Sequence, residues 1–127
     1  MGERAFLGLC GAVFLAFGVA MLLQPVEMLA DFGVAVSGRH GLFEMRGVYG
    51  GVSLGIGALC LAALFRSGLR KGALLTLLAY CGGYIVAQGV AFALDGEPEP
   101  IFYVFIGWEA FVALLSAALL GGQRYVE

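Results

Sequence analysis

The chain has 127 residues, of which 61% are hydrophobic and 13% are charged, and its formal net charge is −2. Soluble domains carry about 25% charged residues, so too few polar side chains are present to cover a water-facing surface, and lipid must be the solvent. The composition excludes a nucleic-acid-binding protein, because Lys and Arg are not clustered, and about four spans of ~20 residues leave no length for a soluble catalytic domain.

The first predicted membrane span is Ala5–Leu23, an uninterrupted apolar run that stops before Pro25, which cannot continue a helix. A signal peptide with Gly18-Val19-Ala20 as its cleavage site is the alternative, and it is disfavoured because the run continues past that site. The connection that follows, Val26–Leu42, is too apolar for a disordered loop. We therefore expect its first part, Val26–Phe32, to form a short interfacial helix in the first outer loop.

The second predicted span, Phe43–Phe65, opens with two charged residues and is rich in glycine. A lone charge that enters an apolar helix is costly, so Arg46 is expected to have a partner, and Glu44 lies two residues before it. The predicted helix-packing glycines of this span are Gly47, Gly50, Gly51 and Gly55. Three of them recur at every fourth residue, a spacing that lets a neighbouring helix approach backbone to backbone.

The third and fourth predicted spans are Gly72–Leu94 and Ile101–Leu120, joined by an acidic turn that carries Pro98 and Pro100. A polar and aromatic stripe with a spacing of four residues runs along the third span: Thr76, Tyr80, Tyr84 and Gln88. Glu109 lies about eight residues into the fourth span, hence ~12 Å deep. A carboxylate at that depth must be paired, protonated or facing a water-filled cavity.

The basic residues predict the orientation of the four spans. The side that would hold both termini and the second loop carries Arg4, Arg66, Arg70, Lys71 and Arg124. The opposite side carries only Arg39 and Arg46, together with most of the acidic residues. The positive-inside rule therefore predicts that both termini are cytoplasmic and that the first and third loops face outward.

This topology places the polar residues of the spans in the outer half of the membrane. The predicted ligand-binding residues or buried polar pair come from Arg46, Tyr49, Tyr84, Gln88, Glu109 and Glu44. A pair between Arg46 and Glu109 is geometrically plausible, because helical side chains lean toward the N-terminus and Glu109 then leans outward. Glu44 is the competing partner. Alternatively, Arg46 extends to the membrane interface and the tyrosines are packed aromatics with a wet hydroxyl.

Chemistry that needs several reactive groups is absent from the sequence. Cys10, Cys60 and Cys81 lie in different apolar runs, so we interpret them as small buried residues and not as a disulfide framework. His40 is the only histidine, and neither a metal-binding spacing nor a catalytic motif occurs. We therefore expect no metal, no cofactor and no enzymatic activity, since Glu109 alone is a thin basis for acid–base catalysis.

The segment Glu44–Gly57, EMRGVYGGVSLGIG, resembles the second helix of a bacterial family of small four-helix membrane proteins of unknown function. The hallmark of that family, Arg-x-x-Tyr-Gly-Gly, is matched by Arg46, Tyr49, Gly50 and Gly51. Asp95-Gly96-Glu97-Pro98 matches its Asp-Gly-x-Pro turn, and Glu109 matches a fourth-helix Glu. Gln88 stands near the position of a frequent family arginine. More distantly, the chain is similar to the DoxX-like group. The resemblance implies a four-helix membrane fold and no established activity.

Residues 1–127 are thus predicted to form one all-α domain, a bundle of four transmembrane helices in a bacterial inner membrane. Because soluble mass is minimal and the helices are glycine-rich, we expect an accessory or assembly subunit that docks on a larger membrane complex, with a homo-oligomer as another possible assembly. The first alternative is a binder or carrier of a small lipophilic molecule, a quinone or a lipid, in an outer-half cavity that Trp108 lines with Tyr49, Tyr84, Gln88 and Glu109. The second is a small proton-coupled transporter or membrane enzyme that uses Glu109, although no repeat or broken helix is evident.

Overall fold

All regular elements in the described part of the chain, residues 1–123 of a computed structural model, are helices. Four helical segments are long and apolar enough to cross a membrane: Glu3–Leu23, Gly38–Phe65, Ser67–Asp95 and Ile101–Gly122. The predicted all-α fold with four candidate membrane spans is therefore confirmed, and the chain is a multi-pass membrane protein. Arg124, one of the cations used to predict the orientation, lies outside the described residues.

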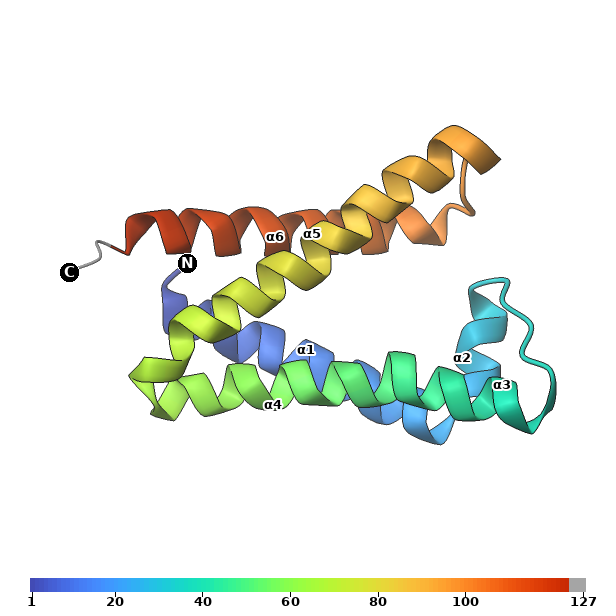
Figure 1. The fold of residues 1–127 in the computed structure, drawn as a ribbon, viewed down its shortest axis with the longest axis horizontal. Helices are drawn as coiled ribbons and strands as arrows, with labels where there is room; N and C mark the ends of the chain where they lie inside the picture. Colours follow the sequence, from blue (N-terminus) through green and yellow to red (C-terminus); the bar gives the residue numbers. More distant parts are fainter. Residues whose placement is uncertain (124–127) are drawn as a thin grey trace. The chain divides into compact units, whose positions relative to one another are not determined.

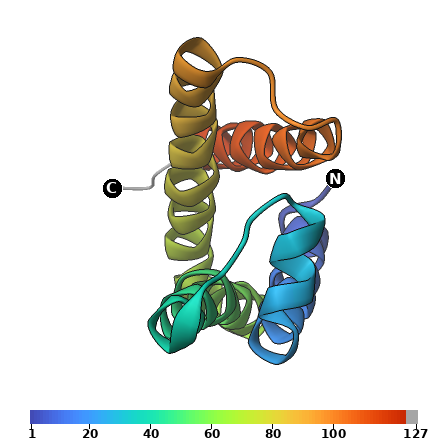
Figure 2. The same ribbon diagram turned by 90° about the vertical axis from the view of Figure 1, so that its right-hand side faces the viewer.

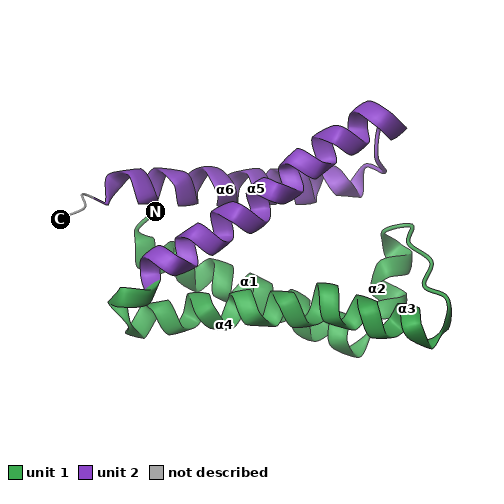
Figure 3. Cartoon of the chain, in the orientation of Figure 1, with its two compact units in different colours: residues 1–69 green, residues 70–127 purple. Residues whose placement is uncertain are grey.

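The chain forms two compact units, Met1–Leu69 and Arg70–Glu127, which Figure 3 colours green and purple. We call them unit 1 and unit 2. Each is built around two long helices that run in opposite directions (Figure 1). The prediction that residues 1–127 form one four-helix domain requires that the two units pack together, and it stays a prediction.

Unit 1 begins with α1 (Glu3–Leu23), which packs along the long helix that contains α4 (Figure 1). The bounds of its other elements are α2, Pro25–Asp31; α3, Gly38–Met45; η1, Arg46–Gly51; α4, Val52–Phe65; and η2, Ser67–Leu69. Figure 2 shows the extended segment that links α2 to α3. The short helix predicted for Val26–Phe32 is present as α2, which starts at Pro25 because proline suits the first helical position.

The second long helix begins earlier than predicted. We expected a connection up to Leu42 and a span from Phe43, but the helix starts at Gly38 and continues to Phe65. Ser37 is extended, with φ −110° and ψ 134°, and Gly38 has a φ of 72°. Glycine adopts this positive φ without strain. Ser37 and Gly38 therefore redirect the chain so that the helix begins at Gly38.

Two glycine pairs bring the backbones of α1 and of the second long helix into close contact. A Cβ added to Gly57 would lie 3.0 Å from the carbonyl oxygen of Gly11. A Cβ added to Gly18 would lie 3.0 Å from the carbonyl oxygen of Gly50. The two glycines of each helix are seven residues apart, about two helical turns, so one face of each helix carries both contacts. This is the close approach that small residues permit between membrane helices.

Of the predicted packing glycines, only Gly50 takes part in this contact. A Cβ at Gly47 or Gly55 would meet no other heavy atom within 4 Å. One at Gly51 would meet only the carbonyl oxygen of Arg46 in its own helix, at 3.9 Å. The reason is their register on the helix. Gly55 lies two residues before Gly57 within α4, about 200° around the helix axis, so it does not share the face toward α1. Gly51 follows Gly50 directly and therefore also points to another side, and Gly47 lies in the π-helical segment η1, whose wider turn gives it a different rotation.

Unit 2 is a hairpin of α5 (Arg70–Asp95) and α6 (Ile101–Gly122). The predicted acidic turn joins them, and its Gly96 has a φ of 89°, which favours glycine. The two helices diverge toward this turn (Figures 1 and 2). The hairpin is therefore open at the end where the turn lies, and this end carries the site described next.

Candidate functional site

Polar side chains from both helices of unit 2 meet in one cluster. The four-residue spacing puts Tyr80, Tyr84 and Gln88 on one side of α5. The ring centroids of Tyr80 and Tyr84 lie 5.1 Å apart, and their side chains are hydrogen-bonded. From α6, the carboxyl group of Glu109 is hydrogen-bonded to the Gln88 side-chain amide and interacts electrostatically with Tyr80. The structure thus brings together three of the predicted site residues, Tyr84, Gln88 and Glu109.

The hydrogen bonding of this cluster is incomplete among residues 1–123. Gln88 Oε1 and Glu109 Oε2 are buried atoms that have no hydrogen-bond partner in this part of the chain. A buried polar atom without a partner costs about 1–3 kcal/mol. Gln88 Oε1 is an acceptor, and so is Glu109 Oε2 when the carboxyl group is ionised. A hydrogen-bond donor is therefore the kind of group that would satisfy both atoms.

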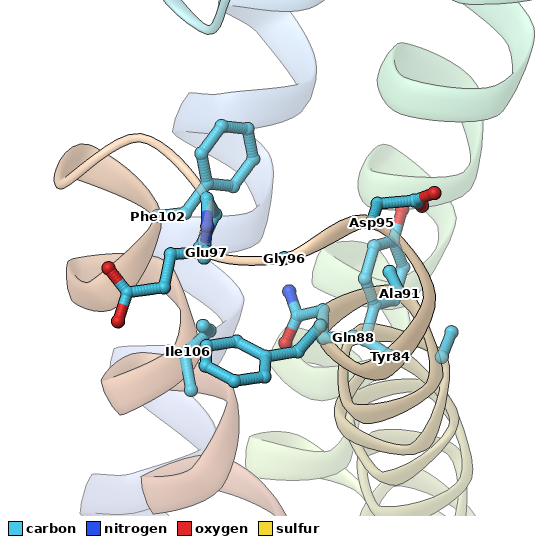
Figure 4. Close-up of a pocket in the computed structure, with 11 residues that line it drawn as sticks. Tyr84, Gln88, Ala91, Asp95, Gly96, Glu97, Phe102 and Ile106 are labelled. Carbon is cyan, nitrogen blue, oxygen red and sulfur yellow. The ribbon is translucent and has the colours of Figure 1, made fainter.

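A groove with a volume of about 430 Å³ lies between α5 and α6, next to this cluster (Figure 4). Polar groups enter its lining from Tyr84 and Gln88 and, at the turn, from Asp95 and Glu97. Its apolar walls include Ala87, Ala91, Phe92, Phe102 and Ile106. In Figure 4 the Gln88 amide points from α5 toward α6, whereas the carboxylates of Asp95 and Glu97 point away from the groove. Gln88 is therefore shared by the groove and the polar cluster.

The charges of unit 2 are all negative between Gly72 and Gln123. This stretch contains no Lys, Arg or His, and its charged residues are Asp95, Glu97, Glu99 and Glu109. The first three belong to the turn at the mouth of the groove, and the fourth is hydrogen-bonded to Gln88. The three turn carboxylates are exposed, so salt screens them. Glu109 is half-buried and screened less, and its carboxylate, when ionised, disfavours an anionic group nearby.

The remaining predicted site residues lie in unit 1, at the π-helical segment η1. The Arg46 guanidinium donates a hydrogen bond to the main-chain carbonyl of Leu22. Leu22 belongs to the last turn of α1, where carbonyls have no intrahelical partner and the helix dipole favours a positive charge. Glu44 is exposed and Tyr49 is half-buried. The predicted pair between Arg46 and Glu109 would join the two units and stays a prediction.

The groove differs in its lining from the cavity that the sequence predicts. Tyr84 and Gln88 line it, but Trp108 and Glu109 do not. The Trp108 ring instead packs against Phe111 on its own helix, with ring centroids 5.9 Å apart. Tyr49 belongs to the other unit.

The sequence places Tyr80 in the polar stripe but not among the candidate site residues, and it does not identify the apolar walls of the groove. Ala91, Phe102 and Ile106 carry no chemical signal of their own, since apolar residues occur throughout the spans. The signal that identifies part of the wall is its register: Phe102 and Ile106 are four residues apart, and Glu109 follows three later, so all three share one face of α6. A cluster of three or more potential metal ligands does not occur among residues 1–123.

The comparison with known families accounts for nearly the whole chain. A family model described as "Domain of unknown function (DUF4345)" matches residues 2–120. Neither a curated protein nor a solved structure matches the chain. The more distant resemblance to the DoxX-like group stays a prediction.

Proposed function

Starting from the finding that the chain belongs to the DUF4345 family, we propose that this membrane protein binds a small lipophilic molecule, a quinone or a lipid, in the groove between α5 and α6. The apolar part of the molecule lies along Ala91, Phe102 and Ile106. Its polar end reaches Gln88, to which Glu109 is hydrogen-bonded.

The observation that supports this proposal is that Gln88, which lines the groove, carries a buried acceptor, Oε1, with no hydrogen-bond partner among residues 1–123. The groove volume of about 430 Å³ falls within the range of ligand pockets, roughly 300–1,000 Å³. Such pockets combine apolar walls with a few convergent polar groups, here Tyr84 and Gln88. A groove between two membrane-spanning helices is reached from the bilayer, so its ligand is lipophilic.

The polar end of the ligand supplies most of the selectivity. A lipophilic molecule in the bilayer is already surrounded by hydrocarbon, so contact with Ala91 and Phe102 gains packing but little hydrophobic free energy. A donor at that end, such as the hydroxyl or amino group of a lipid, satisfies the buried acceptor Gln88 Oε1, whose lack of a partner costs about 1–3 kcal/mol. A quinone, whose oxygens only accept, would bond to the amide N–H of Gln88 instead.

Filling the groove tests the proposal. Wild-type protein, extracted gently from its own membrane, is analysed by native mass spectrometry beside Ala91→Trp, which places an indole in the groove. Ala93→Trp is the matched control, because Ala93 is exposed on the same helix and does not line the groove. We expect a discrete small mass on the wild type and on Ala93→Trp and its loss from Ala91→Trp. The proposal is wrong if the wild type carries no small molecule, or if Ala91→Trp retains as much of it as the control.

The proposal includes an orientation in a bacterial inner membrane, with both termini cytoplasmic. It is supported by the positive-inside rule, because the loop between the second and third spans carries Arg66, Arg70 and Lys71. In this orientation the acidic turn faces outward, and the ligand enters the groove from the outer leaflet.

A second candidate function, an accessory or assembly subunit, is favoured by the glycines that α1 does not contact. A Cβ at Gly47 or Gly55 would have no heavy atom within 4 Å, and small residues on membrane helices permit close contact with another helix. In this function a helix of a larger membrane complex packs on that face. Gly55→Leu should then abolish a stoichiometric complex in native mass spectrometry, and Gly89→Leu, an equally open position on α5, should not. A complex that survives Gly55→Leu would contradict this candidate.

A further inference from the structure

The polar cluster beside the groove and the charged residues of this part of unit 2 share one character. Gln88 Oε1 and Glu109 Oε2 are buried and lack a hydrogen-bond partner among residues 1–123. Every charged residue from Gly72 to Gln123 is acidic. A ligand with an anionic head, such as a fatty acid, would bring a second negative charge close to Glu109, whose Oε2 is buried and weakly screened. We therefore expect the groove to disfavour acids.

We propose that the ligand of the groove is a lipophilic amine, a molecule with a hydrocarbon tail and a protonated amino group. This inference rests on the proposed ligand-binding function and specifies the chemical class of the ligand. A primary ammonium group carries three donors and no acceptor. It can donate to Gln88 Oε1 while its positive charge compensates Glu109, the neighbour of Gln88 in the cluster.

A neutral hydroxyl group meets fewer of these requirements. It donates only one hydrogen bond, and it brings no positive charge to compensate Glu109 when that carboxyl group is ionised, a state that is costly inside a membrane. Hydrogen bonds that involve an ionised group are roughly twice as strong as neutral ones. The ring of Tyr84, which lines the groove, can add a cation–π attraction that an alcohol does not receive.

The chain has its own candidate for this role in Arg46, the predicted partner of Glu109. In unit 1 the Arg46 guanidinium donates to the Leu22 carbonyl, so it already has a favourable site at the end of α1. Neutralisation of Glu109 by Arg46 and neutralisation of Glu109 by a bound amine predict different ligand preferences. A groove whose Glu109 is neutralised by Arg46 would not distinguish an amine from an alcohol of equal length.

Three probes with the same twelve-carbon tail test the inference: dodecylamine, dodecanol and dodecanoate. Each is titrated into the full-length protein in detergent micelles at neutral pH, and bound probe is counted by native mass spectrometry. We expect dodecylamine to bind about tenfold more tightly than dodecanol and dodecanoate to bind most weakly. Glu109→Gln should reduce the preference for the amine over the alcohol nearly to equality. Glu27→Gln, which removes an exposed acid of α2, should leave that preference unchanged.

The outcomes separate this inference from the proposed function. If the three probes bind equally and all are lost from Ala91→Trp, the groove binds lipophilic molecules without selecting amines, and the inference is overturned while the proposed function stands. If Ala91→Trp binds the probes as the wild type does, the groove is not the site and both fail. A preference that persists in Glu109→Gln also overturns the inference. If circular dichroism shows that Glu109→Gln is unfolded, the amine and alcohol affinities of Gln88→Leu, which removes the acceptor Oε1, are measured instead. A preference for the amine that persists in Gln88→Leu then overturns the inference.

Discussion

The contact between α1 and α4 predicts opposite behaviour for two glycines of one helix. Gly57 faces α1: a Cβ there would lie 2.9 Å from the Leu15 main-chain nitrogen and 3.0 Å from the Gly11 carbonyl oxygen. Gly55, two residues earlier, would gain a Cβ with no other heavy atom within 4 Å. Gly57→Ala therefore perturbs the helix pair, and Gly55→Ala is its matched control.

The geometry sets the size of the difference. The nearest atom to a Cβ at Gly57 is Leu15 Cγ, at 2.7 Å, and the next two are main-chain atoms. Main-chain atoms cannot rotate away, so α1 and α4 must move apart by roughly half an ångström to restore ordinary contact. Overpacking of this kind costs about 1–3 kcal/mol. Both variants share the gain in helix propensity from glycine to alanine, about 1 kcal/mol, and this gain cancels in the comparison. Gly57→Ala should therefore be less stable than Gly55→Ala by about 1–3 kcal/mol.

The assay is reversible unfolding in mixed micelles, with the sodium dodecyl sulfate fraction as denaturant and far-ultraviolet circular dichroism as the signal. The difference between the free energies of unfolding of the two variants is the quantity compared. Equal values for Gly57→Ala and Gly55→Ala would refute the reasoning, because they would mean that α1 does not approach α4 at Gly11 and Gly57. A Gly55→Ala variant that is the less stable of the two would refute it equally.

Three further predictions concern the ends and the interior of the spans. Arg46→Ala removes the hydrogen bond to the Leu22 carbonyl and should lower the free energy of unfolding by about 1 kcal/mol in the same titration; an unchanged value would show that Arg46 does not stabilise the end of α1. Ser53 is buried, and its hydroxyl has no hydrogen-bond partner within residues 1–123. Ser53→Ala should therefore leave stability unchanged or raise it by up to about 1 kcal/mol, and a measured loss would contradict this account. In a cysteine-free background in intact cells, Glu99→Cys should react with a membrane-impermeant maleimide and Ser67→Cys should not; the reverse pattern would invert the proposed orientation.

The helices and turns follow from local properties of the chain, and this is why the sequence predicts them well. Apolar runs of about twenty residues must form helices in lipid, because each main-chain polar group has to be satisfied within its own segment. Pro25 ends α1 and begins α2, and the acidic turn ends α5, as predicted. The early start of α3 was missed because glycine usually interrupts a helix, whereas Gly38 adopts the positive φ that leads into this one.

The face that each helix buries is not a local property. The sequence predicts packing at Gly47, Gly50, Gly51 and Gly55. In the structure Gly50 and Gly57 face α1, because they share one side of their helix and the matching glycines, Gly11 and Gly18, lie on a segment far away in the chain.

Composition and chain order thus suffice to specify a multi-pass helical membrane protein, the places where its helices turn and the polar residues that are costly in lipid. Only the tertiary structure assigns partners to those residues: the Leu22 carbonyl to Arg46 and the Gln88 amide to Glu109. A polar group in hydrocarbon must find a partner, but which partner it finds depends on the distances between helices. Those distances are set here by glycines and by the turn that joins α5 to α6, since they determine how closely two backbones approach and where they diverge.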